Sequence, residues 1–154
     1  MSLFEVEAYQ RPSFDTINWK ETKTAVGIFL VQYKIARERV GLPVFPKRTG
    51  TYHLLNEEQK RIATSIELAE VEPYQKEFLR FNQLFILGYS AIMHPYKSDV
   101  TDRRRTVFML RYVYGLSIEA ISEQIYYQKN CIIEDSKISL IAFAQALSII
   151  QTNV

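Results

Sequence analysis

The side chains best suited to chemistry lie between residues 103 and 137, and their types favour hydrogen bonding to a partner over catalysis. Gln128, Lys129 and Asn130 stand in a row, and further polar residues follow at helical spacing. Amide and ammonium groups of this kind can pair with the edges of DNA bases. The guanidinium groups upstream have the fork geometry that binds phosphate, and they belong to Arg103, Arg104, Arg105 and Arg111.

Catalytic and metal-binding patterns are not found in the sequence. His53 and His94 stand apart, without a cysteine or an acidic pair at the spacing of metal ligands. Gly-rich phosphate loops, H-E-x-x-H helices and G-x-S-x-G elbows are missing as well. The carboxylate pair Glu57 and Glu58 stands at the start of a predicted helix, where it would complement the helix dipole. We therefore expect no enzyme, no cofactor and no metal site.

Three helices joined by short turns are predicted to position the polar groups. Thr101 or Asp102 can cap the first helix, and Gly115 stands where the chain must leave it in a left-handed conformation. Ser117 can cap the second helix. A turn over 126–128 follows, and the third helix is predicted to begin near Lys129 and to run through Leu147.

The order of these elements predicts a helix-turn-helix whose last helix would lie in a DNA major groove. Val107, Leu110 and Tyr114 share one face of the first helix, and the second helix turns Ile118, Ile121 and Ile125 inward. The arginines would meet backbone phosphates, which position a protein without reading sequence. The candidate base-reading residues are Gln128, Lys129, Asn130, Ile133, Glu134 and Lys137.

The rest of the chain also has helical periodicity, so we predict an all-α helical bundle with this motif at its C-terminal end. An apolar stripe predicts a helix over 19–40, ended by Gly41 and Pro43 and weakened by Gly27 inside it. Helices over 56–71 and from Pro73 onward follow. The predicted regions are an extended N-terminal arm over 1–18, a helical region over 19–95 and a helix-turn-helix domain over 101–154.

Composition agrees with an ordinary globular protein. The chain has 154 residues, 47% of them hydrophobic, and a net charge of +2. Cys131 is the only cysteine, which suits a reducing compartment. The N-terminal residues do not resemble a signal peptide, and the apolar run over 78–93 is too short and too polar to span a bilayer. We expect a soluble protein in the cytoplasm of a bacterial host, without a membrane partner.

The C-terminal pattern resembles region 4 of bacterial sigma factors and, more closely, phage regulators of the ArpU family and the related RinA-type activators. The residues that carry the resemblance include Leu110-Arg111-Tyr112, Gly115-Leu116-Ser117 and the segment 119–123. The family's turn glycine is Tyr126 here, and Asp135 replaces an apolar residue. The resemblance implies double-stranded DNA as a partner, contact with RNA polymerase or a regulatory protein, and activation of phage late genes in a Gram-positive host.

Three alternatives remain open from the sequence. Glu134 and Asp135 make the last helix acidic, so the motif could instead be a protein-interaction module that binds polymerase, a repressor or another regulator. A plain three-helix bundle with similar turns is another interpretation. The aromatic helix over 78–93 can be core or a homodimer interface. A continuous basic surface joining the arginines to Lys129 and Lys137 would favour DNA, whereas an interrupted one would favour a protein partner.

Overall fold

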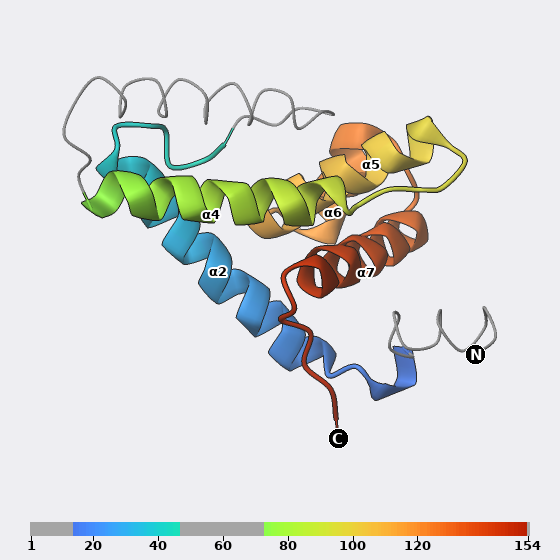
Figure 1. Cartoon of the computed structure of the whole chain (residues 1–154). Helices are drawn as coiled ribbons and strands as arrows, with labels where there is room; N and C mark the ends of the chain where they lie inside the picture. Colours follow the sequence, from blue (N-terminus) through green and yellow to red (C-terminus); the bar gives the residue numbers. More distant parts are fainter. Residues whose placement is uncertain (1–13, 47–72, 154) are drawn as a thin grey trace.

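The computed structural model describes residues 14–46 and 73–153, and its regular elements in these ranges are helical. The predicted all-α class is therefore confirmed for the described part of the chain. The predicted helix over 56–71 lies outside it. The helices, shown in Figure 1, are η1 (Phe14–Thr16, 3-10), α2 (Trp19–Arg39), α4 (Pro73–Ser90), α5 (Ser98–Phe108), η2 (Met109–Val113, a π-helix), α6 (Ile118–Ile125) and α7 (Lys129–Ala146).

Helix α2 begins at Trp19 as predicted and ends at Arg39, one residue before the predicted end. The Asn18 side chain accepts a hydrogen bond of 3.0 Å from the Glu21 N–H, which satisfies one of the free donors at the helix start. At the other end Gly41 has a φ of +83°, a left-handed conformation that stops the helix. The predicted apolar stripe, including Val26, Leu30 and Tyr33, is buried.

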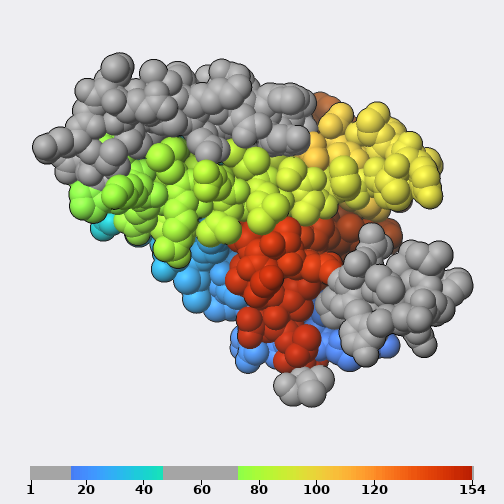
Figure 2. Space-filling model, viewed as in Figure 1, coloured from blue at the N-terminus to red at the C-terminus, as the bar shows by residue number. Residues whose placement is uncertain are grey.

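Helix α4 begins at Pro73 as predicted and crosses α7 at close range. Gly88 makes this approach possible, because a Cβ atom there would lie 2.5 Å from the Phe143 ring of α7 and 2.7 Å from a Leu147 methyl group. Figure 2 shows α4 and α7 in direct contact on the face that it draws. Phe85, Tyr89 and Phe143 pack together in the interior. Phe78, Phe85 and Tyr89 of α4 therefore form core.

One large core joins the two predicted regions of the chain. It contains Phe29 of α2, Phe85 of α4, Phe108 of α5 and Phe143 of α7, together with their buried neighbours. A second, smaller cluster lies within the C-terminal part and is formed by Val107, Leu110, Ile121 and Ile132. The C-terminal helices are thus anchored on α2 and α4 while having an apolar centre of their own.

The end of the predicted N-terminal arm is held against the C-terminal tail. Ile17 forms an isolated antiparallel bridge with Thr152, and the Asn18 N–H donates to the Gln151 carbonyl at 2.9 Å. Thr22 on α2 adds to this clasp, since its Oγ1 accepts a hydrogen bond of 3.0 Å from the Gln151 N–H. The described end of the arm is therefore tied to the body, and the arm's first thirteen residues lie outside the described ranges.

Candidate nucleic-acid interface

The C-terminal unit, defined as residues 98–146, contains the two turns that the sequence predicts. Gly115 has a φ of +78°, and the Leu116 N–H returns to the Leu110 carbonyl at 2.8 Å. The Ser117 hydroxyl then accepts a hydrogen bond of 3.1 Å from the Ala120 N–H and caps α6. The predicted roles of Gly115 and Ser117 are confirmed.

The predicted start of α5 is wrong by one turn. The helix begins at Ser98, not after a cap at Thr101 or Asp102. Thr101 instead stabilises the linker, because its Oγ1 accepts a hydrogen bond of 2.6 Å from the His94 N–H. The His94 Nδ1 atom accepts from the N–H groups of Tyr96 and Lys97, both at 3.1 Å. These contacts order the linker and let the helix begin earlier.

A π-helical segment, η2, continues α5 and was not predicted. The Tyr114 N–H donates to the Met109 carbonyl at 2.9 Å, five residues back. Here the Tyr112 hydroxyl lies 2.7 Å from Ser136 Oγ on α7 and donates to the Ser136 carbonyl at 3.1 Å. Burial raises the pKa of Tyr112, so this phenol stays protonated and can donate. Apolar periodicity cannot show such a widened turn.

Helix α6 is fixed by its apolar face, as predicted. Ile121 is fully buried and packs with Val107, Leu110 and Ile132 in the smaller core cluster. Ile118 and Ile125 are half-buried and pack against the same cluster. The second helix of the unit is therefore held between α5, η2 and α7.

The turn between α6 and α7 contains a strained residue. Tyr126 has φ of +61° and ψ of +39°, a left-handed conformation that is unfavourable for residues with a Cβ atom. Its N–H completes α6 by donating to the Ser122 carbonyl at 2.9 Å. The Ser122 hydroxyl donates in turn to the Tyr127 carbonyl. The turn places α7 with its first residue at Lys129, where the sequence predicts it.

Four of the six candidate base-reading residues lie exposed in the first turns of α7: Lys129, Asn130, Ile133 and Glu134. Gln128, also exposed, occupies the cap position before them. Lys129 forms a surface ion pair of 2.7 Å with Glu119 of α6. Lys137 is exposed as well, but its ammonium lies 5.6 Å from the centre of the Trp19 ring on α2. The structure thus groups five of the six residues and places Lys137 toward α2.

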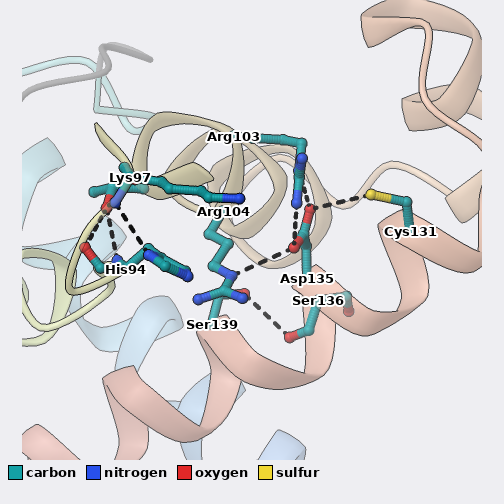
Figure 3. Close-up of polar contacts among 9 residues, drawn as sticks. His94, Lys97, Arg103, Arg104, Cys131, Asp135, Ser136 and Ser139 are labelled. Atoms are coloured by element: carbon teal, nitrogen blue, oxygen red, sulfur yellow. Dashed lines mark hydrogen bonds and ion pairs between the residues drawn. The ribbon is translucent and has the colours of Figure 1, made fainter. Parts of the chain in front are cut away.

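Asp135 differs most from its expected place. The sequence suggests an exposed acid beside Glu134, but the Asp135 side chain is only 2% exposed and faces α5. Arg103 Nε donates to Oδ2 at 2.5 Å, and Arg104 Nε lies 3.4 Å from Oδ1. Figure 3 shows the two guanidinium groups meeting this carboxylate. Its negative charge is therefore balanced inside the protein.

The four arginines predicted to bind phosphate make internal contacts. Arg103 lies over the Tyr127 ring at 4.9 Å, and the hydrogen bond to Asp135 raises the pKa of its guanidinium. Arg111 donates to the Leu116 carbonyl at 3.0 Å. Arg105 is 8% exposed and donates to the carbonyls of Ile92 and Ser90 at 2.8 and 3.1 Å. The phosphate prediction for Arg105 is wrong, because this buried group is bonded to the end of α4 and the linker.

Cys131 belongs to the same cluster. Its Sγ atom lies 3.8 Å from Asp135 Oδ2, and the side chain is partly buried. Burial raises the pKa of the thiol, and the Asp135 charge adds to this effect. The thiol is therefore protonated at neutral pH and serves as a weak donor to the carboxylate.

The described residues contain neither a metal cluster nor a membrane-spanning helix. Across residues 14–46 and 73–153, no group of three or more His, Cys, Asp or Glu side chains is arranged to hold a metal ion. No helix within those ranges is long and apolar enough to cross a membrane. His53 lies outside them, and His94 belongs to the linker before α5.

The basic groups near α7 are held in separate places. Arg103 and Arg104 share Asp135, Lys129 is paired with Glu119, and Lys137 lies toward Trp19. Within the described residues, the basic surface around α7 is therefore interrupted. Comparisons with protein-family models, with curated proteins and with solved structures find no match for this chain.

Proposed function

We propose that the C-terminal unit is a helix-turn-helix resembling sigma region 4, and that the protein is a phage-type transcriptional regulator that binds double-stranded DNA. One observation carries the proposal most directly. The start of α7 is an exposed row of polar residues at the end of three packed helices, and one of its two acids, Asp135, is buried and paired with Arg103 and Arg104, while Glu134 is exposed. Preformed base-reading groups on a rigid helix are what major-groove recognition needs.

Each exposed side chain has a matching base edge. Asn130 can pair with adenine through two hydrogen bonds, Lys129 can donate to guanine, and Gln128 can do either. Ile133 can contact the methyl group of thymine, and Glu134 can accept from cytosine N4. Lys129 must first leave Glu119, which requires little free energy because the two side chains are 57% and 73% exposed.

The regulatory role rests on the resemblance of residues 110–132 to ArpU-type and RinA-type activators. In this proposal, the C-terminal unit binds a site near a late promoter. The part of the chain formed by α2 and α4 contacts RNA polymerase or another regulator, and homodimers bind paired half-sites. Helix α4 uses its aromatic face for the core, so a dimer must use another surface.

A protein partner is the second candidate, and the interrupted basic surface favours it. Arg103, Arg104 and Arg105 hold the fold together, which leaves few cations to meet phosphates. In this alternative, the exposed start of α7 binds polymerase, a repressor or another regulator. If the protein co-purifies with a host protein and nuclease treatment does not disrupt this association, the protein-partner alternative is favoured over DNA binding.

Fluorescence anisotropy with duplex DNA from phage and host promoters at low salt tests the proposal. We expect saturable binding, and we expect Lys129→Ala and Asn130→Ala each to weaken specific binding by about 1–3 kcal/mol, roughly five- to 150-fold. Lys23→Ala removes an exposed charge from α2 and serves as the control, with unchanged binding. A wild-type protein that binds no duplex at low salt would exclude DNA binding as the function.

The salt dependence of that binding tests the internal role of the arginines. Each phosphate contact contributes a slope of roughly −0.9 to a plot of log affinity against log salt concentration. Because the arginines are used inside the unit, we expect only about two or three such contacts. A much steeper slope would show that Arg103 and Arg104 leave Asp135 and bind phosphates.

A further inference from the structure

Tyr126 combines an unfavourable backbone with a side chain that the fold does not use. Its left-handed conformation lowers the ratio of folded to unfolded protein by about five- to thirtyfold for an ordinary residue, whereas glycine adopts it freely. A buried ring would offset this effect by packing. The Tyr126 side chain is instead 91% exposed. Strain at an exposed residue points to a role outside the fold.

The neighbouring contacts show that the turn holds its shape without the Tyr126 ring. The Tyr126 N–H and the Tyr127 carbonyl are both bonded to Ser122, through its carbonyl and its hydroxyl. The Tyr127 ring is partly covered by Arg103, whose guanidinium lies 4.9 Å from its centre. These contacts use the Tyr126 backbone and the next side chain, so a smaller residue at 126 would keep them.

We propose that the Tyr126 side chain binds the sugar-phosphate backbone of DNA beside the groove that α7 enters. The inference rests on the proposed function. Tyr126 is exposed and stands two residues before the exposed polar row of Gln128, Lys129 and Asn130, so the turn that carries it adjoins the surface that would meet the bases. The phenol donates to a phosphate oxygen, and the ring packs against a deoxyribose. Because Arg103, Arg104 and Arg105 make contacts within the protein, the Tyr126 hydroxyl, a neutral donor, would take the place of one arginine–phosphate contact.

Opposite effects on stability and binding test the inference. In Tyr126→Gly, the ratio of folded to unfolded protein in urea titrations should be unchanged or up to about fivefold higher, because relief of strain equals or exceeds the entropic loss. Affinity for duplex DNA should fall about tenfold in anisotropy titrations. Asparagine also tolerates the left-handed backbone and lacks the ring, but it is less flexible than glycine. Tyr126→Asn should therefore lose as much affinity as Tyr126→Gly, which shows that the loss does not come from added backbone flexibility. Tyr126→Phe should lose about two- to fourfold, through the hydroxyl alone.

Tyr96→Ala is the matched control, since Tyr96 is also 91% exposed but lies in the linker before α5. It should bind DNA like the wild type. Wild-type affinity in both Tyr126→Gly and Tyr126→Asn would overturn the inference while leaving the proposed function intact. A loss of stability in Tyr126→Gly would also overturn it, by showing that the ring serves the fold. Absence of wild-type binding to any duplex would overturn both.

Discussion

Asp135 contributes a buried charge to the contact between α5 and α7, with Arg103 and Arg104 as its partners. Removing one member of a buried ion pair leaves the others without a counter-charge in a place that water reaches poorly. Two guanidinium groups share this one carboxylate, so the cluster is already positively charged, and loss of the acid leaves both arginines without a counter-charge. Asp135 therefore ties the first half of α7 to α5.

Substitution of Asp135 by Asn should therefore destabilise the protein strongly. We expect the free energy of unfolding to fall by about 3 kcal/mol, measured by urea titration followed by circular dichroism. Glu134→Gln is the matched control, because Glu134 is the adjacent acid and is exposed, and it should change stability by less than about 0.5 kcal/mol. Equal, small effects for the two variants would show that the cluster contributes little.

The sequence alone could not show that Asp135 is buried while the adjacent Glu134 is exposed. Successive residues on a helix point about 100° apart. The sequence shows both as charged residues in a polar stretch, and only the position of α5 decides which of them is covered. The burial of Arg105 could not be predicted for the same reason, since its partners are the carbonyl of Ser90 at the end of α4 and that of Ile92 in the linker after it.

At the scale of elements, the crossing of α4 and α7 determines how the C-terminal unit is mounted on the rest of the chain. Gly88 lies at the crossing, where the Phe143 ring leaves no room for a methyl group. Gly27 lies inside α2, and apart from the neighbouring backbone of the helix itself no described heavy atom lies within 4 Å of the place that a Cβ atom would take there. The two glycines thus share a helical setting and differ in their surroundings.

Alanine at these two positions should have effects of opposite sign. Gly27→Ala should stabilise the protein by up to about 1 kcal/mol through helix propensity. Gly88→Ala gains the same propensity but forces Phe143 and Leu147 to move, so we expect a net loss of about 1–3 kcal/mol. Thermal unfolding of the two variants checks this. A stabilising Gly88→Ala would mean that the helices do not cross this closely.

Helix ends with clear capping residues were predictable, whereas contacts between distant segments were not. Gly41, Gly115 and Ser117 mark helix ends that agree with the structure, because caps act through neighbouring backbone groups. The start of α5 depends on the bond between Thr101 and His94 across the linker. The π-helical turn of η2 packs against α7. Apolar periodicity in the sequence reveals neither the Thr101–His94 bond nor this packing.

At the scale of the whole molecule, α2 and α4 share one core with α5 and α7, so the start of α7 is mounted on a rigid body. Within the described residues, the predicted regions over 19–95 and 101–154 join in this core and do not each form a large core of their own. Rigid mounting is favourable for reading DNA, because base contacts require side chains held in place before binding. The whole chain has a net charge of only +2, so specificity must come from those contacts more than from general attraction to phosphates.

Selection of binding sites from a pool of random duplexes tests this account most directly. The wild-type protein should enrich one short motif, and Asn130→Ala should relax the preference at an adenine within it while leaving the other positions unchanged. No enriched motif with the folded wild-type protein, or the same motif with Asn130→Ala and Lys129→Ala, would contradict the claim that the start of α7 reads DNA bases.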